Sequence, residues 1–447
     1  MKSLFRALII ALLFGFSVSA KNPNVLIIVS DDMGWSDIGY VNPKVKTPNL
    51  DRLAREGVRF ERFYANPLCS VTRAALMTGR STLVTGVNNR RGLPLHYPIM
   101  AESFKKAGYT TWMLGKWHLG GSRSNHFNTS DYLPHNRGFD HFYGHLNGTL
   151  HYISHRMGAS NGPKDWWRNG VAVNEEGFQT ELLANEAIEL IEKRDTETPF
   201  FLYLAYHAPH TPLSPTPTGM ALYKDIKNPG QKLVYANITF MDSQIGRIIN
   251  VLKERDELED TLVLFFNDNG GVPRAGSNNL PLRSQKGTVY EGGIRVRAFA
   301  RWPKLLPQAT TSYQFMCVMD LFPTLASAAG INLPDTMQFD GFDLWDSIVA
   351  DRESSRPDFV MGNSDMAVYR PPWKLIIPAG LGNPQLFDIV EDPYERNDVI
   401  GGNPQITLAL TNIGNEMISM AGVTPEENAA QTRGRLRGGR GGARGTR

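Results

Sequence analysis

Four apolar runs constrain the fold of this chain more than any other feature of its sequence. Each is rich in β-branched or aromatic residues and ends abruptly in charged or polar ones: NVLIIVSDD (24–32), YTTWMLGKWH (109–118), PFFLYLAYHAPH (199–210) and TLVLFFNDNGG (261–271). Near-continuous apolar runs are typical of strands that are covered on both faces, as in a parallel sheet between helices. We therefore expect these segments to be the central strands of an α/β domain.

Segments with helical periodicity lie between the runs. Residues 180–194 and 235–255 each repeat apolar side chains along one stripe. Residues 100–108 end in Gly108, a common helix stop, directly before the second run. Because strand and helix alternate, the sequence predicts an open, doubly wound sheet.

The pattern changes in the last third of the chain. A helical stretch at 318–331 is followed by short strand-like segments at 367–378 and 384–399. These predict a small antiparallel sheet with a terminal helix, packed against the main domain. We expect the large α/β domain to span 21–335 and a smaller C-terminal α+β domain to span 336–425.

The two ends of the chain differ in composition from the rest. Residues 1–20 contain Lys2 and Arg6, then an apolar run, and end in small residues that fit a signal-peptidase cleavage site. This pattern predicts a signal peptide and a secreted or periplasmic protein. Residues 433–447 carry six arginines and no acid, and we expect the Gly/Arg-rich tail, 426–447, to be disordered. No later stretch is long and apolar enough to span a bilayer, so we expect no stable membrane anchor.

The formal net charge of +3 does not indicate a nucleic-acid partner. Subtracting the six arginines of the tail and the two cations of residues 1–20 leaves a charge of −5 on the body of the chain. A body with this balance lacks the basic surface that binds nucleic acid, so we expect no such partner. The tail itself suits either loose binding of an anionic polymer or a plain solvated end.

Cys69 and Cys317 are the only cysteines, so one disulfide at most is possible. Cys317 lies in an apolar stretch and is interpreted as a small buried side chain. Cys69 instead precedes a predicted helix, with Arg73 close behind it. The free amide hydrogens of a helix start favour an anion, so the position of Cys69 suits chemistry better than packing.

Reactive side chains follow all four apolar runs, and the carboxyl ends of parallel strands meet at the edge where ligands bind. In chain order these side chains are Asp31 and Asp32, Lys116 and His118, His207 and His210, and Asp268 and Asn269. Any one pair has an ordinary explanation as a turn or a loop cap. Four pairs at one edge indicate a functional site.

The acidic members of this set predict a hard metal ion. Four residues offer oxygen ligands only: Asp31, Asp32, Asp268 and Asn269. An all-oxygen set selects calcium or magnesium over zinc, and three close carboxylates need a cation to stay ionised. With Arg73, Lys116 and Lys286 nearby, the ion would stabilise an oxyanion during group transfer. A thiolate at position 69 is a poor partner for a hard metal, and an oxygen nucleophile would fit better.

These residues carry a resemblance to the sulfatases of the alkaline phosphatase superfamily. CSVTRAALMTGR (69–80) is similar to the first family signature, Cys-x-Pro-x-Arg with a Thr-Gly-Arg ending, and GYTTWMLGKWH (108–118) is similar to the second. SDDMG, NDNGG and LRSQKGTVYEGGIR (282–295) match further, and with GFDHFYGHLNG the chain most resembles the arylsulfatase B (N-acetylgalactosamine-4-sulfatase) group. The resemblance implies a large mixed, mostly parallel sheet between helices, with a smaller domain of antiparallel strands.

The resemblance also implies calcium-dependent hydrolysis of sulfate monoesters, with a sulfated saccharide or an aryl sulfate as substrate. In that family a formylglycine-generating enzyme oxidises the signature cysteine to Cα-formylglycine, whose hydrate supplies the attacking oxygen. Carried over to this sequence, one calcium ion would be held by Asp31, Asp32, Cys69, Asp268 and Asn269.

The implied roles of the remaining residues follow from two-stage covalent catalysis. Arg73 and Lys116 would support the hydrate while one of its hydroxyls attacks sulfur. His207 or Lys286 would protonate the leaving alcohol, and His118 would then take the proton of the second hydroxyl so that sulfate leaves. The expected substrate contacts are Lys116, His207, His210 and Lys286. His207 is the stronger candidate of the two histidines in HAPH, because it lies directly at the strand end.

Two positions depart from the family pattern. Val71 stands where the signature has proline, although valine also favours the extended form in which the modifying enzyme reads this segment. Arg297 stands where the family turns apolar. If Val71 blocks conversion of Cys69, the chain would be a non-catalytic binder of sulfated glycans. A phosphomonoester or phosphodiester hydrolase is the other alternative, although such an enzyme would carry serine or threonine as its nucleophile.

Overall fold

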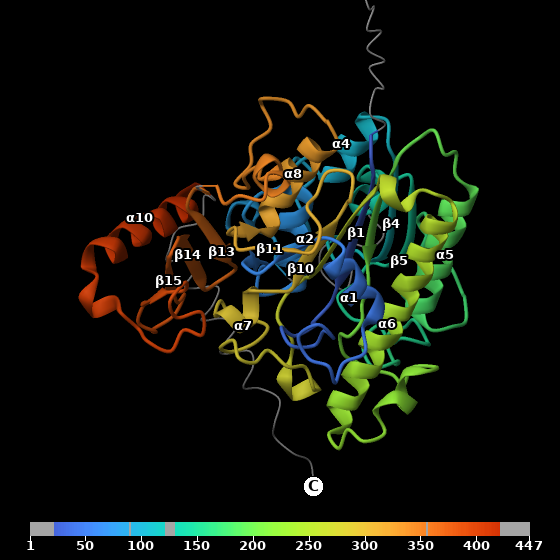
Figure 1. Ribbon diagram of the computed structural model, residues 1–447, viewed down its shortest axis with the longest axis horizontal. Helices are drawn as coiled ribbons and strands as arrows, with labels where there is room; N and C mark the ends of the chain where they lie inside the picture. Colours follow the sequence, from blue (N-terminus) through green and yellow to red (C-terminus); the bar gives the residue numbers. More distant parts are fainter. Residues whose placement is uncertain (1–21, 89–90, 121–129, 355, 421–447) are drawn as a thin grey trace, which may run out of the picture.

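The four apolar runs form neighbouring strands at the centre of one ten-stranded sheet (Figure 1). The computed structural model describes residues 22–88, 91–120, 130–354 and 356–420. The central strands are β1 (Asn24–Ser30), β4 (Thr110–Lys116), β8 (Phe200–Ala205) and β9 (Thr261–Asn267). They lie in the order β9-β1-β8-β4, and each neighbouring pair is parallel. The predicted parallel core is confirmed.

Six further strands extend this core on both sides and make the sheet mixed. β5 (His141–His145) is parallel to β4, and an antiparallel hairpin of β6 (Trp167–Arg168) and β7 (Val171–Ala172) follows it. On the other side, β10 (Ala298–Arg301) is antiparallel to β9. The outermost strands there are β2 (Val58–Phe60) and β11 (Thr310–Ser312). None of these six strands was predicted.

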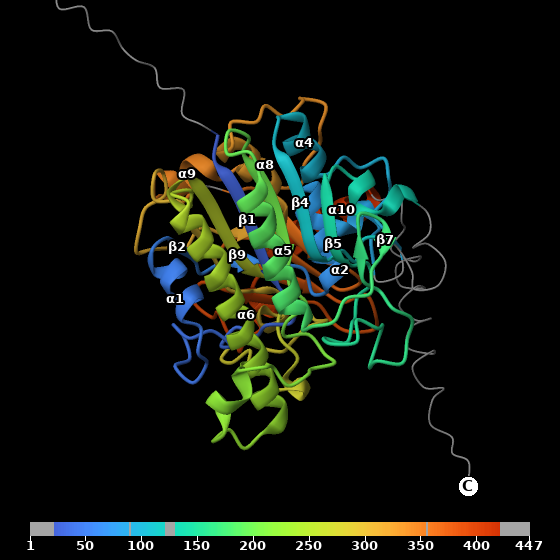
Figure 2. The same cartoon turned by 90° about the vertical axis from the view of Figure 1, so that its right-hand side faces the viewer.

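Helices cover both faces of the sheet, as Figure 2 shows for α5 and α6 on one side. Alternate residues of β1 divide the core: Leu26 and Ile28 pack with α1 (Pro48–Arg55), α5 (Gln179–Lys193) and α6 (Pro229–Glu254). Val25 and Ile27 pack with α2 (Cys69–Thr78), α4 (Met100–Lys106) and α8 (Leu321–Ala328). The shorter helices are α3 (Thr82–Thr85), α7 (Glu291–Ile294) and α9 (Trp345–Val349).

The C-terminal part forms a second, four-stranded antiparallel sheet that packs against the first (Figure 1). Its strands are β13 (Phe359–Gly362), β14 (Met366–Arg370), β15 (Trp373–Ile377) and β16 (Gln385–Asp388). One face packs on α10 (Pro404–Met420), and the other joins the core of the main sheet through Tyr369 and Ile376. A short parallel pair, β3 (Phe63–Tyr64) and β12 (Met316–Cys317), contacts the C-terminal sheet, because the Tyr64 ring packs against Phe359 and Tyr369. The predicted fold class is confirmed.

Three sequence-based expectations remain outside these findings. The signal peptide (1–20) and the tail (426–447) lie outside the described residues. The proposed boundary between 335 and 336 stays a prediction, because the C-terminal sheet shares one hydrophobic cluster with the main domain. Among the described residues, no helix combines the length and apolar character needed to cross a membrane.

Glycines let the strands approach closely where they reach the site. Gly115, next to the end of β4, has φ +101°, and a Cβ there would lie 2.0 Å from the carbonyl oxygen of Ala205. Gly144 of β5 packs in the same way, since a Cβ there would lie 2.2 Å from the Gly115 carbonyl oxygen. This close contact fixes the backbone that presents Lys116.

We therefore expect Gly115→Ala to lower the free energy of unfolding by at least about 2 kcal/mol, from left-handed strain and the clash with Ala205. Gly380→Ala is the matched control, since no heavy atom lies within 4 Å of a Cβ there, and it should stay within about 0.5 kcal/mol of the wild type. Urea unfolding measures both, and equal stability of the two variants would contradict this account of strand packing.

Candidate active site

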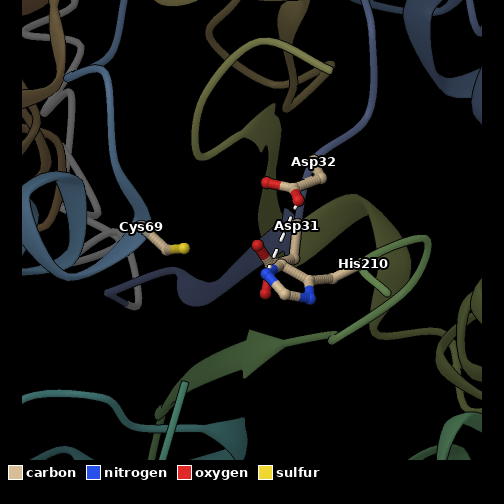
Figure 3. Close-up of side chains that lie close together, drawn as sticks. All are labelled: Asp31, Asp32, Cys69 and His210. Atoms are coloured by element: carbon tan, nitrogen blue, oxygen red, sulfur yellow. Dashed lines mark ion pairs between the residues drawn. The ribbon is translucent and has the colours of Figure 1, made fainter. Parts of the chain in front are cut away.

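The side chains that follow the four central strands meet at the carboxyl edge of the sheet, as predicted. Asp31 and Asp32 follow β1, and His210 reaches them from the loop after β8 (Figure 3). Cys69, the first residue of α2, points toward this group from the neighbouring segment (Figure 3). One ligand atom from each of these four residues lies within 4.8 Å of the others.

Asp31 is fully buried and lies against two cationic side chains. Lys116 forms an ion pair with its Oδ2, and Arg73 Nη2 lies 3.8 Å from the same oxygen. His207 Nδ1 lies 3.5 Å from it. Burial raises the pKa of Asp31, but Lys116, His210 and the other cations outweigh burial and hold it well below its usual range. The Asp31 carboxylate is therefore ionised.

Asp32 has a left-handed backbone, with φ +64°, and its carboxylate lies within 4.8 Å of the Cys69 sulfur. Lys286 Nζ lies 2.5 Å from Asp32 Oδ1, and Asn269 Nδ2 donates to the same oxygen at 2.7 Å. His210 Nε2 lies 3.5 Å from Oδ2. Asp32, which follows β1, thus contacts residues that follow β8 and β9 and the loop that carries Lys286.

Asp268 is held by Arg73, whose Nη2 donates a hydrogen bond to it at 2.8 Å. The other guanidinium nitrogen, Nη1, donates to the Lys116 carbonyl at 2.7 Å and to the Tyr203 hydroxyl at 3.3 Å. Burial, together with the negative charge of Asp31, raises the pKa of Asp268 well above its ordinary value. The protein's own cations therefore do not fully compensate the carboxylates that they face.

A hard metal ion fits this arrangement. Two buried oxygens at the strand ends, Asp31 Oδ1 and Asn269 Oδ1, have no hydrogen-bond partner among the described residues. A buried oxygen without a partner is costly unless it coordinates an ion. Both belong to the predicted calcium ligands, and a cation beside them would also lower the pKa of Asp268. The donor set is mostly oxygen, as calcium prefers.

Cys69 occupies the first turn of α2, preceded by the extended Leu68 (φ −141°, ψ 148°). Lys286 Nζ lies 3.5 Å from its Sγ. Burial and Asp31 raise the pKa of the thiol, but Lys116, Lys286 and His210 outweigh them and lower it to about 7. The position at the start of α2 therefore stabilises negative charge, as expected for the site of an attacking group.

The three predicted site histidines have different environments. His207 is 1% exposed, accepts a hydrogen bond from the Leu150 amide at 3.4 Å, and burial lowers its pKa to about 3. His210 is 8% exposed, and although burial lowers its pKa, Asp32 and Asp31 raise it overall. Burial, Lys116 and Arg73 hold the pKa of His118 well below its ordinary value. His118 and His207 are therefore neutral, whereas His210 tends to carry a proton.

The structure explains Arg297, which departs from the family pattern, and confirms that Cys317 is a buried side chain. Arg297 packs over the Trp35 ring at 3.4 Å, and its Nη1 donates to both carboxylate oxygens of Glu61 at 3.0 and 3.1 Å. Arg297 itself is buried, and its ion pair with the partly exposed Glu61 accounts for an arginine in the otherwise apolar segment before β10. Both cysteines are free, and Cys317 is fully buried beside Arg356, as its apolar surroundings indicated.

Comparisons with known proteins agree with this geometry. The sulfatase family matches residues 23–331 of the chain. Arylsulfatase J of Mus musculus is 33% identical over 356 residues, 77% of this chain and 58% of that protein, so the chain spans little more than half the length of this relative. N-acetylgalactosamine-6-sulfatase of Sus scrofa is 35% identical over 79% of this chain and 71% of that protein.

A crystal structure of Ps i-CgsB in complex with k-i-k-neocarrahexaose superimposes with a TM-score of 0.82 at 30% identity, covering 93% of this chain and 97% of that one. The fold and these likenesses define a protein with the alkaline phosphatase-like architecture. The chain belongs to the sulfatase family. The resemblance inferred from the signatures is thereby confirmed, whereas its placement near N-acetylgalactosamine-4-sulfatase stays a prediction.

The charge around Cys69 leads to a pH-dependent expectation for metal-free protein in which this residue is still a thiol. Because the thiolate is the reactive form, alkylation of Cys69 by iodoacetamide should rise with pH and reach half its maximal rate near pH 7. Cys317 is the internal control: burial raises its pKa, so it should stay unmodified in the folded protein. Peptide mass spectrometry separates the two sites, and equal labelling of both, or a midpoint above pH 8.5, would contradict this description.

Proposed function

We propose that the protein hydrolyses sulfate monoesters of sugars, with Cα-formylglycine made from Cys69 as the nucleophile and one calcium ion in the site. The observation that carries this proposal is the position of Cys69. It lies at the start of α2, against Lys286 and within 4.8 Å of ligand atoms of Asp31 and Asp32. A chain that kept this thiol would present a soft atom to an oxygen-rich, hard-metal site.

Calcium would be held by Asp31, Asp32, Asp268, Asn269 and residue 69, and when bound it supplies positive charge for the sulfate oxygens. The formylglycine hydrate supplies the attacking oxygen. The chain's own residues would position both groups. Arg73 holds Asp268 and the Lys116 carbonyl in place, and Lys116 is aimed into the same space from the end of β4.

The cations of the site also suit the leaving group. Lys286 is 16% exposed in its side chain and contacts both Cys69 and Asp32, so it lies where an ester oxygen would depart. Of the two histidines in HAPH, His210 has a raised pKa and His207 a lowered one. This difference favours His210 as the proton donor. His118 is neutral and half-buried, so it can accept the proton that must leave residue 69 before sulfate is released.

A sulfated saccharide is the proposed substrate class. One relative is named N-acetylgalactosamine-6-sulfatase, and the similar solved structure holds a neocarrahexaose. The proposal also includes maturation by a formylglycine-generating enzyme and export directed by residues 1–20. Val71 is buried within the first turn of α2, so the maturation enzyme must read this segment before the helix forms.

Mass spectrometry of the Cys69 peptide, combined with sulfate release from sulfated saccharides, tests the proposal. Protein made together with a formylglycine-generating enzyme should carry an aldehyde at position 69, and Cys69→Ala should lower kcat by at least about 1000-fold. Cys317→Ala is the matched control and should keep wild-type kcat, because Cys317 lies outside the site. A protein that always retains the Cys69 thiol and binds, but never cleaves, sulfated saccharides would instead be a glycan-binding protein.

A further inference from the structure

We infer that Lys374, in the C-terminal sheet, is a positioning residue for the site: through two buried glutamates it holds the loop that keeps Lys286 against residue 69. The inference deepens the proposed function and rests on it only for the role of Lys286 in turnover. The contact of Lys286 with Cys69 is a feature of the structure itself.

Lys374 lies on β15 and is 0% exposed. Its Nζ donates to Glu291 Oε1 at 2.8 Å and to Glu395 Oε1 at 2.7 Å. A buried ammonium between two carboxylates is stable only while all three groups keep their partners. The cluster therefore ties β15 to α7, which begins at Glu291, and to the turn after β16 that carries Glu395.

The two glutamates fix the backbone of the loop that precedes α7. Glu395 Oε2 accepts the Glu291 amide hydrogen at 2.7 Å, and the Glu395 carbonyl accepts from Arg283 Nη1 at 2.9 Å. Between these two anchor points lie residues 284–290. Tyr290 adds a third tie to the C-terminal sheet, since its hydroxyl donates to Gln385 Oε1 at 2.6 Å. The loop is thus bonded to the C-terminal sheet on both sides of Lys286.

The same loop touches the site through its backbone. The Gly287 amide donates to the Pro67 carbonyl at 2.8 Å, two residues before Cys69, and the Lys286 amide donates to the Gly271 carbonyl at 3.2 Å. Just beyond the loop, in α7, the Gly293 carbonyl accepts from the Gly270 amide at 2.9 Å, next to Asn269. A shift of the loop would therefore move the ammonium of Lys286 relative to residue 69.

The backbone at Glu395 also indicates a positioning role. Glu395 has φ +55°, a left-handed conformation that non-glycine residues rarely adopt. Such a conformation persists only where the surroundings hold it in place, and here it directs the carboxylate to Lys374 and the carbonyl to Arg283. The fold thus holds a strained residue at the junction between the C-terminal sheet and the Lys286 loop.

Alkylation of Cys69 by iodoacetamide at pH 6, in metal-free protein that still carries the thiol, reports the position of Lys286 without any turnover. Lys286→Met should slow the reaction several-fold, because it removes the ammonium that lies 3.5 Å from the Cys69 sulfur. Lys374→Met should slow it by a similar factor, because the loop is released. Adding Lys374→Met to Lys286→Met should slow it no further, since both changes remove one contact.

Arg356→Met is the matched control. Arg356 forms another buried ion pair, 2.6 Å from Asp320, and among the described residues its hydrogen bonds go to Asp320, Cys317 and Pro357, outside residues 282–295. Its loss should leave the Cys69 alkylation rate at the wild-type value. Lys374→Arg keeps the charge and should restore most of the rate, and Glu395→Gln, which keeps the side-chain shape, should slow it even if Lys374→Met does not fold.

The inference would be overturned if folded Lys374→Met and Glu395→Gln proteins were alkylated at the wild-type rate. It would also be overturned if adding Lys374→Met to Lys286→Met slowed alkylation by a further factor as large as that of the single variant. The outcomes also separate this inference from the proposed function. If the loss of Lys374 slows alkylation but the matured protein releases no sulfate, positioning stands and the proposed activity fails. If sulfate is released and the Lys374 variants behave as wild type in both assays, the activity stands and positioning fails.

Discussion

Buried negative charge at the ends of β1 and β9 is the constraint on which the rest of the site depends. Three carboxylates lie there out of solvent, and carboxylates in a low-dielectric setting remain ionised only when cations or hydrogen-bond donors face them. Arg73, Lys116 and Lys286 supply part of this compensation from three different segments of the chain. Among the described residues, two oxygens there have no hydrogen-bond partner, and the pKa of Asp268 is raised, so the site has room in its charge balance for a further cation.

The sequence predicted the elements in which local pattern and final burial agree. The four central strands are covered on both faces, so their apolar runs are continuous, and the residues that follow them meet because parallel strands end at one edge. β5 was not predicted, because its sequence HFYGH interrupts the apolar pattern with two histidines and a glycine. Its position in the sheet depends on pairing with β4, where His145 lies opposite Lys116.

Contacts between residues far apart in the chain could not be predicted either, because they also depend on how distant segments pack. Nothing near Lys374 in the chain predicts that it is buried between Glu291 and Glu395, since each of the three residues has an ordinary solvated interpretation by itself. The choice between the two histidines of HAPH also depended on the fold. Sequence position favoured His207, whereas burial and charge in the structure favour His210 as a proton donor. The contact of Lys374 with Glu291 and Glu395 is likewise visible only once the packing of the C-terminal sheet is known.

The most direct test of the central claim is a crystal structure of the matured protein grown with calcium and soaked with sulfate. The account predicts one calcium ion about 2.3–2.6 Å from Asp31 Oδ1 and Asn269 Oδ1, with sulfate between Lys116, Lys286 and residue 69. Calcium bound elsewhere, with these two oxygens still lacking any ligand, would contradict it.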